Sequence, residues 1–113
     1  MDRGTRPPRA RHFWVTDRDD LQARWFALTR ERMPVAAPER HWPVRFDHCF
    51  QRILLDNACG QPWREAIDAP AYRNASDELL ERAIALGEAA LGGSEDLPTL
   101  NRRSLEMRGK LRR

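Results

Sequence analysis

Residues 44–60 read VRFDHCFQRILLDNACG, and this stretch decides the fold. Its apolar side chains recur at the three- and four-residue spacing of an α-helix and form one broad stripe: Phe46, Cys49, Phe50, Ile53 and Leu54. Pro43 suits a first helical turn, and Gly60 suits a helix C-terminus. We therefore predict a helix over residues 44–58 and expect it to be the most buried element.

A first helix is expected on the N-terminal side of this segment. Thr16 is a suitable N-cap, and the acidic residues after it favour a helix over residues 17–32. Pro34 is expected to end that helix, because a proline disfavours helical geometry in the residue before it. Three prolines within residues 34–43 then indicate a connector rather than a helix.

Two more helices and a short turn are expected on the C-terminal side. A proline at the start of residues 62–67 predicts a single helical turn. Ser76 is a suitable N-cap for a helix over residues 77–91. Gly87 lies inside that helix at a cost in helix propensity, which a close helix–helix crossing would explain. The last helix is expected over residues 98–111, where apolar residues form a narrow seam.

The fold class follows from these segments. Nothing in the sequence alternates at a period of two residues, and β-branched residues are scarce, so a sheet is not expected. The length of 113 residues suits one domain. We predict an all-α bundle of four main helices with a short extra turn, in a single domain over residues 13–113, preceded by a flexible basic arm over residues 1–12.

The charge pattern is uneven along the chain. The net charge is +3, but residues 1–12 carry four Arg and one Asp, and residues 97–113 carry five Arg, one Lys and one Glu. These segments contribute +3 and +5, which leaves −5 for residues 13–96. Basic ends can contact phosphates or acidic partners. The preference for Arg over Lys is also typical of a GC-rich genome, so charge alone does not establish nucleic-acid binding.

The cellular location is expected to be the cytoplasm. The polar start of the chain does not resemble a secretory signal, and no apolar run approaches the roughly 20 residues that span a bilayer. Two cysteines are too few for a disulfide scaffold, and free thiols suit a reducing compartment. We therefore expect no membrane partner.

One face of the helix predicted over residues 44–58 is the candidate ligand-binding site. The residues follow one another at steps of three or four on that face, or flank the helix as aromatic groups: Arg45, His48, Arg52, Asp56, Trp42 and Trp63. Such a line of charges can bind an anion, but it also describes an ordinary solvated face. An open, concave lining would favour the site, whereas coverage by another part of the chain would indicate a paired structural network.

Neither a thiol nucleophile nor a metal site is favoured in this region. Adjacent residues on a helix point about 100° apart, so His48 cannot easily reach the thiol of Cys49. Cys49 and Cys59 are ten residues apart, which is about 15 Å along one helix. No pair of potential ligands has a familiar zinc-site spacing. We predict no metal and no cofactor, and we assign no catalytic residue.

The C-terminal segment is a second candidate binding surface. It combines the narrow apolar seam with four basic side chains, which could contact nucleic acid or an acidic partner: Arg102, Arg103, Arg108 and Lys110. An ordinary bundle helix with a frayed basic end is the alternative.

Three functions remain open at this level. The leading hypothesis is a small intracellular accessory or adaptor protein that binds a protein partner, because the chain is small, rich in aromatic residues and free of the common nucleotide-binding and hydrolase motifs. The second is a nucleic-acid-binding regulator that uses the basic ends. The third is a small enzyme or anion-binding protein whose site lies on the helix over residues 44–58.

Overall fold

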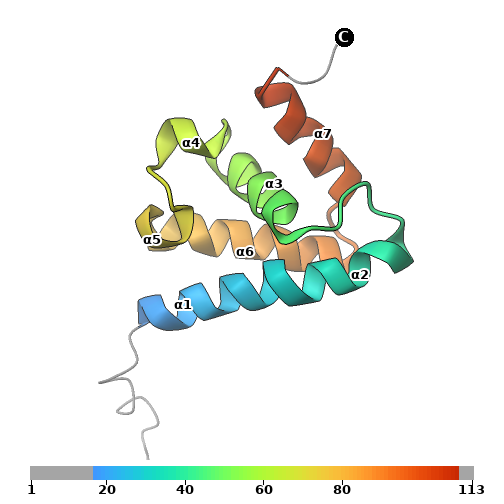
Figure 1. Ribbon diagram of the computed structural model, residues 1–113, viewed down its shortest axis with the longest axis horizontal. Helices are drawn as coiled ribbons and strands as arrows, with labels where there is room; N and C mark the ends of the chain where they lie inside the picture. The colour runs from blue at the N-terminus through green and yellow to red at the C-terminus, as the bar shows by residue number, and fades with distance from the viewer. Residues whose placement is uncertain (1–16, 110–113) are drawn as a thin grey trace, which may run out of the picture.

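The structure is a computed structural model that describes residues 17–109, and this part of the chain is all-α, without strands (Figure 1). The elements in chain order are α1 (Asp17–Phe26), the π-helical segment η2 (Ala27–Arg32), α2 (Met33–Arg40), α3 (Asp47–Cys59), α4 (Trp63–Ala66), α5 (Ala71–Asn74), α6 (Asp77–Gly92) and α7 (Leu97–Met107). Because α1, η2 and α2 follow without a break, they form one long helix. Together with α3, α6 and α7, it gives the four main helices that the sequence predicts.

The first long helix corrects the prediction that Pro34 ends it and that residues 34–43 form a connector. The amide of Met33 donates to a carbonyl five residues earlier, instead of four. This π-helical turn is wider than an α-turn and lies directly before the proline, whose ring would otherwise collide with a carbonyl of the preceding turn. The helix therefore continues through Pro34 and Pro38. It ends only before His41, which adopts a left-handed φ of 56°.

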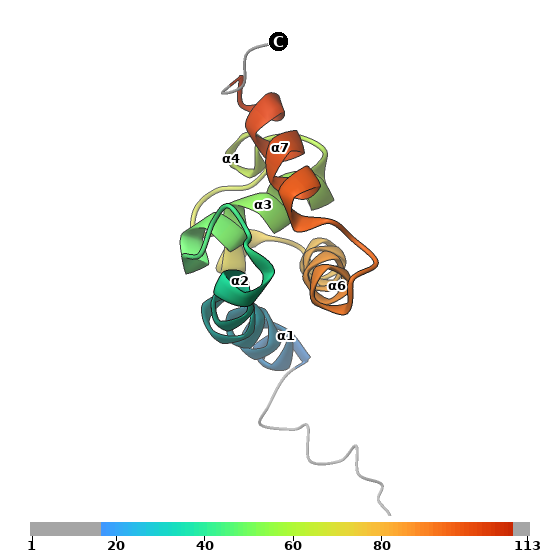
Figure 2. The same cartoon turned by 90° about the vertical axis from the view of Figure 1, so that its right-hand side faces the viewer.

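α3 lies across the layer that the first long helix and α6 form together (Figure 2). It begins at Asp47, three residues later than predicted, so Pro43 lies outside its first turn. Gly60 ends it with a left-handed φ of 75°, as the sequence predicts. The core-facing side chains of α3 are fully or almost fully buried: Phe50, Ile53, Leu54 and Leu55. Their burial agrees with the central position expected for this helix, but Phe46 of the predicted stripe precedes the helix and is 60% exposed.

α6 packs closely along the first long helix. A Cβ atom added to Gly87 would lie 2.5 Å from Cδ2 of Leu28, so the two helices approach there as closely as the glycine allows. The expected close crossing at this position is therefore confirmed. Ion pairs join the two helices along the outside of this contact: Arg18 with Asp77, Arg24 with Glu81, and Arg32 with Glu88.

α7 covers the side of α3 that faces away from the first long helix (Figures 1 and 2). Asp96 caps its N-terminus by accepting a hydrogen bond from the amide of Thr99. The helix buries Leu97, Leu100 and Ser104. It ends at Met107, four residues before the predicted end.

The remaining elements agree with the sequence except for α5. α4 lies inside the turn predicted over residues 62–67, and α6 matches the helix predicted over residues 77–91 to within one residue. Ser76 accepts a hydrogen bond from the amide of Leu79, as expected of an N-cap. α5 (Ala71–Asn74) is a single turn that the sequence pattern does not predict.

Some predictions concern residues outside the described part of the chain. They are the flexible arm over residues 1–12, the capping role of Thr16 and the surface position of Lys110. No helix within residues 17–109 combines the length and the apolar character needed to cross a membrane.

Candidate functional site

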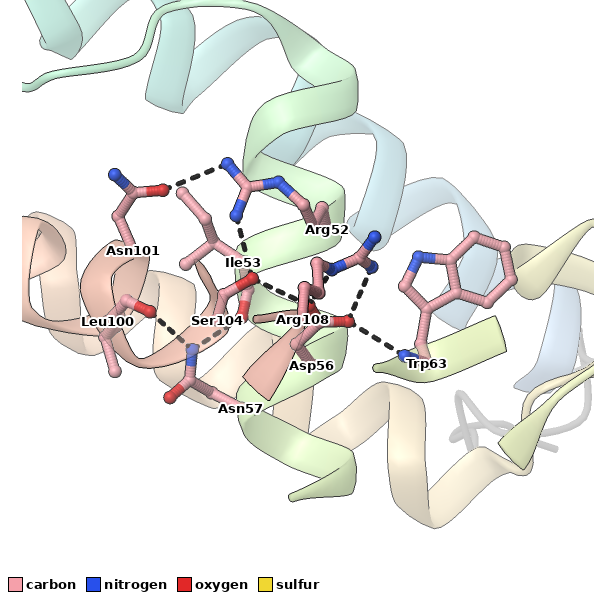
Figure 3. A network of polar contacts seen from close by, with 9 residues as sticks. All are labelled: Arg52, Ile53, Asp56, Asn57, Trp63, Leu100, Asn101, Ser104 and Arg108. Carbon is pink, nitrogen blue, oxygen red and sulfur yellow. Dashed lines mark hydrogen bonds and ion pairs between the residues drawn. The ribbon is translucent and has the colours of Figure 1, made fainter. Parts of the chain in front are cut away.

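A carboxylate with no solvent contact lies on the polar face of α3. Asp56 is 0% exposed. It accepts hydrogen bonds from the backbone amide of Trp63 at 2.8 Å and from the hydroxyl of Ser104 at 2.6 Å. Nε and Nη2 of Arg108 donate to it from 2.6 and 3.0 Å (Figure 3). Asp56 therefore ties α3 to the start of α4 and to the C-terminal end of α7.

Arg52 extends this network by one turn of α3. Its Nη1 donates to the hydroxyl of Ser104 at 2.7 Å, and its Nη2 donates to Oδ1 of Asn101 at 3.0 Å. The hydroxyl of Ser104 thus links the Arg52 guanidinium to the Asp56 carboxylate. None of the ion pairs among residues 17–109 includes Arg52, and its hydrogen bonds to this part of the chain go to neutral groups.

The pairing of Arg108 with Asp56 changes how the C-terminal basic residues are understood. The hydrogen bonds that Arg108 donates to Asp56 raise the pKa of Arg108, and this effect exceeds the opposing effect of burial. The side chain of Arg108 is 25% exposed and belongs to the internal network. Arg102 and Arg103 are exposed on α7. Of the four basic residues proposed for this surface, one is therefore largely engaged inside the protein.

A groove of about 530 Å³ opens beside the network. Its walls come from α1 and η2, from α3, from the segment that runs from α4 to α5, and from Arg108, the residue after α7. Its basic side chains are Arg30, His48, Arg52, Arg64 and Arg108. Its aromatic side chains are Trp25, Phe26, Trp63 and Tyr72. Within the described ranges, no Asp or Glu lines it, so the groove combines aromatic walls with positive charge.

Contacts between the aromatic and basic groups order the walls of the groove. The guanidinium carbon of Arg30 lies 3.8 Å from the centre of the Phe26 ring, and that of Arg64 lies 5.2 Å from the centre of the Trp63 ring. Phe26 also meets Tyr72 edge-on, with ring centres 5.0 Å apart. Cation–π contacts hold flexible arginines against rings without neutralising their charge. The walls are therefore partly arranged before any ligand binds.

The groove brings together three of the six residues predicted for the site. His48, Arg52 and Trp63 line it. Asp56 lies beneath, where Arg108, Ser104 and the amide of Trp63 occupy its oxygens. The polar face of α3 is thus covered at Arg52 and Asp56 by α7 and open towards the groove at His48, whose side chain is 77% exposed. Both outcomes considered from the sequence occur, on neighbouring turns of one helix.

The other two predicted residues lie outside the groove. Arg45 is exposed and precedes the first residue of α3, so it does not share the helical face of His48. Trp42 packs edge-on against Phe50, with ring centres 5.8 Å apart, and is half-buried at the border of the core.

Several groove residues were not predicted from the sequence. Arg30, Phe26 and Tyr72 belong to α1, η2 and α5, which meet α3 only in the folded chain. The spacing of four residues between Phe26 and Arg30 places them on one helix face and was the available signal. No site residue was predicted on the first helix.

The two cysteines and the potential metal ligands form no further site within the described part of the chain. Cys49 and Cys59 are free and half-buried. Burial, and secondarily the charge of Asp56, raises the pKa of the Cys59 thiol. Over residues 17–109, no three His, Cys, Asp or Glu side chains come together in a way that could hold a metal ion.

Comparisons of the chain with known protein families, curated proteins and solved structures find no match. The function must therefore be inferred from the side chains of the groove and of the adjoining network.

Proposed function

We propose that this protein is a small accessory protein that acts by binding a protein partner, and that the groove beside α3 receives an acidic segment of that partner. The supporting observation is the lining of the groove, in which arginines and aromatic rings occur together without an acidic side chain from the described residues. Trp, Tyr and Arg are the residue types that contribute most to binding energy at protein interfaces. A cationic groove would also attract an acidic segment over a distance and orient it.

The charges at the rim of the groove are weakly neutralised. Nε of Arg30 lies 3.9 Å from a carboxylate oxygen of Asp47, and both side chains are about half exposed. Exposed pairs of this kind contribute little. Arg64 forms no ion pair with another described residue. Both arginines are therefore available to carboxylates of a partner.

The size of the groove indicates how much of a partner it can hold. A volume of about 530 Å³ accommodates a few side chains, whereas a stable interface buries roughly 800 Å² on each partner. Additional contacts would have to come from neighbouring surface. Phe46 is 60% exposed and stacks on His48 at the groove, with ring centres 5.9 Å apart. It can extend the apolar contact beyond the groove.

The nucleic-acid alternative has less support than the sequence suggests. It relied on the basic residues of the last helix, and one of them, Arg108, donates two hydrogen bonds to a buried carboxylate. Arg102 and Arg103 remain available on the surface of α7. A test of binding should therefore include a DNA duplex.

Binding of synthetic peptides tests the proposal. A fluorescent peptide that contains Glu, Asp and Phe is titrated with the full chain, beside a peptide in which Lys replaces the acidic residues and beside a labelled DNA duplex. We expect the acidic peptide to bind with the highest affinity. The variant Arg30→Glu/Arg64→Glu should weaken its binding at least about tenfold, or about 1.4 kcal/mol.

The matched control is Arg82→Glu/Arg103→Glu, which changes the net charge equally but lies outside the groove. It should leave the affinity for the acidic peptide within about twofold, because screening makes distant surface charges weak. Equal losses in both variants would mean that only the overall charge matters. Preference for the duplex, abolished by the control variant, would favour the nucleic-acid alternative instead.

A further inference from the structure

We infer that the inner end of the groove, where Arg52, Arg108 and Trp63 meet, is a binding site for a single oxyanion, a carboxylate or phosphate group carried on an aromatic or apolar body. This inference rests on the proposed function in taking the groove as the binding surface, and it names the chemical group that the groove selects. The network that holds Asp56 supplies the argument, since it determines the charge at this end.

The network contains one carboxylate, that of Asp56, and two guanidinium groups, those of Arg52 and Arg108. Asp56 is paired directly with Arg108 and is linked to Arg52 through the hydroxyl of Ser104. The three ionised groups together carry a charge of +1. Arg64 adds a further positive charge at the same groove and has no carboxylate partner within the described residues. Glu65, whose charge helps to raise the pKa of Arg108, offsets one of these charges, and the inner end still has more positive than negative charge.

The positive charge of Arg52 is partly removed from water. Its guanidinium is part-buried, and its hydrogen bonds to other described residues go to the neutral oxygens of Ser104 and Asn101. A desolvated charge whose partners are neutral gains more from an approaching anion than an exposed charge does, because the local dielectric constant is lower. Arg52 thus distinguishes the inner end from the exposed arginines at the rim.

The geometry of the network holds the two arginines in place before a ligand arrives. Arg108 uses Nε and Nη2 for Asp56, and Arg52 uses both Nη atoms for Ser104 and Asn101. In the view of Figure 3, the Arg108 guanidinium is drawn between Arg52 and the indole of Trp63. Such preorganisation reduces the entropy lost on binding.

The aromatic walls specify what the oxyanion is attached to. Trp63 and Tyr72 line the groove that contains the arginines, together with the rings of Trp25 and Phe26. An apolar or planar body would lie against these rings while its charged end meets the guanidinium groups. An aryl phosphate or an aromatic carboxylate combines both features, whereas inorganic phosphate has only one of them.

Titrations of the full chain with phenyl phosphate, benzoate, inorganic phosphate and acetate test the inference. Binding is followed by isothermal titration and by the chemical shifts of the Trp indole N–H and Arg Nε–H groups. We expect saturable binding of at least one aromatic anion, at least about tenfold tighter than its non-aromatic counterpart, with shifts at Trp63 and Arg52. The comparison of phosphate with carboxylate identifies the preferred oxyanion.

Two variants and a control decide whether the inner end is responsible. Arg52→Gln should weaken binding of the aromatic anion roughly tenfold, since it removes a charge-assisted hydrogen bond, and Arg64→Gln, which removes a rim charge, should weaken it about threefold. Arg64 has no hydrogen bond in the network, so Arg64→Gln remains informative if Arg52→Gln does not fold. Arg82→Gln on α6, outside the groove lining, should leave binding unchanged.

The inference is overturned if none of the four anions shows saturable binding. It is also overturned if Arg52→Gln, Arg64→Gln and Arg82→Gln bind the aromatic anion with the same affinity. Its failure can be separated from failure of the proposed function. An acidic peptide that binds in the groove and that phenyl phosphate and benzoate do not displace would overturn the oxyanion site alone. Aromatic anions that bind when no acidic peptide does would uphold the site and contradict binding of a protein segment.

Discussion

At the scale of single residues, Gly87 shows how closely the helices pack. In Gly87→Ala, the new methyl group would meet Cδ2 of Leu28 at 2.5 Å and Cδ1 of Leu54 at 3.1 Å, and both leucines are fully buried. Alanine would gain about 1 kcal/mol of helix propensity, but overpacking of a core typically costs about 1–3 kcal/mol. We expect a net loss of up to about 2 kcal/mol in the free energy of unfolding, measured with urea.

The same helix offers a matched control for this prediction. A Cβ atom added to Gly92 would have no neighbour within 4 Å. Gly92→Ala should therefore be neutral or should stabilise the protein by up to about 1 kcal/mol. If both alanine variants changed stability in the same direction and by the same amount, the close approach at Gly87 would not be the cause.

Asp56 marks the limit of what the sequence reveals about a single residue. The spacing of four residues correctly places Arg52 and Asp56 on one face of a helix. Whether that face is solvated or buried depends on Ser104 and Arg108, which lie 48 and 52 residues later in the chain. No local pattern encodes that contact, because it depends on where α7 docks. The same reason explains why Arg30 and Tyr72 were missed at the groove.

At the scale of elements, the caps at Ser76 and Gly60 were predicted correctly and the end of the first helix was not. Ser76 and Gly60 act through backbone geometry within one turn, so their positions in the sequence suffice to predict α6 and the end of α3. Pro34 was expected to end the first helix because an α-helical turn has no room for its ring. The wider turn of the π-helical segment before Pro34 accommodates the ring. No simple periodicity in the sequence predicts a π-turn.

The docking of α7 is a property of this element that can be tested. Arg108→Gln would leave the buried Asp56 without its charged partner, and such losses cost about 3–5 kcal/mol when the pair is fully buried. Because Arg108 is 25% exposed, we expect about 3 kcal/mol, at the lower end of that range. Hydrogen exchange should accelerate in α7 more than in α6, since the network attaches α7 to α3.

Two further variants show whether the effect comes from the network. Arg103→Gln removes an exposed charge from the same helix and should change stability by less than about 0.5 kcal/mol. The double variant Asp56→Asn/Arg108→Gln should be less destabilised than the sum of its single variants, because no unpaired carboxylate remains. Additive losses would contradict a direct coupling between the two side chains.

At the scale of the whole molecule, the distribution of charge separates two regions. The sequence indicates an acidic middle segment between basic ends, with −5 over residues 13–96. In the folded chain, acidic residues of α6 pair with arginines of the first long helix: Asp77, Glu81 and Glu88. The groove lies elsewhere and, within the part of the chain that the structure covers, has no acidic side chain in its lining. A chain with an acidic middle segment thus contains a cationic groove, which the average charge conceals.

The free energy of unfolding is expected to decrease in acid, because two carboxyl groups have a lowered pKa in the folded protein. A hydrogen bond from Arg32 lowers the pKa of Glu88, and hydrogen bonds from the hydroxyl and amide of Thr99 lower the pKa of Asp96. A carboxyl group with a lowered pKa in the folded state stabilises the protein above its unfolded pKa, near about 4, and loses that contribution as the pH falls through the folded pKa. The free energy of unfolding should therefore be nearly constant above about pH 5 and should fall below it.

The variant Glu88→Gln/Asp96→Asn isolates the share of these two groups in that loss. Asn remains a good N-cap and Gln can still accept a hydrogen bond from Arg32, but neither side chain titrates. Between about pH 7 and about pH 3, the variant should lose less free energy of unfolding than the parent protein in urea titrations. The other carboxyl groups titrate in both proteins, so the difference belongs to these two positions. Glu78→Gln, an exposed substitution on α6, should follow the parent. A group that no longer titrates cannot contribute to the dependence of the free energy of unfolding on pH. Equal losses of this free energy in all three proteins would therefore show that the contacts with Arg32 and Thr99 do not govern acid stability.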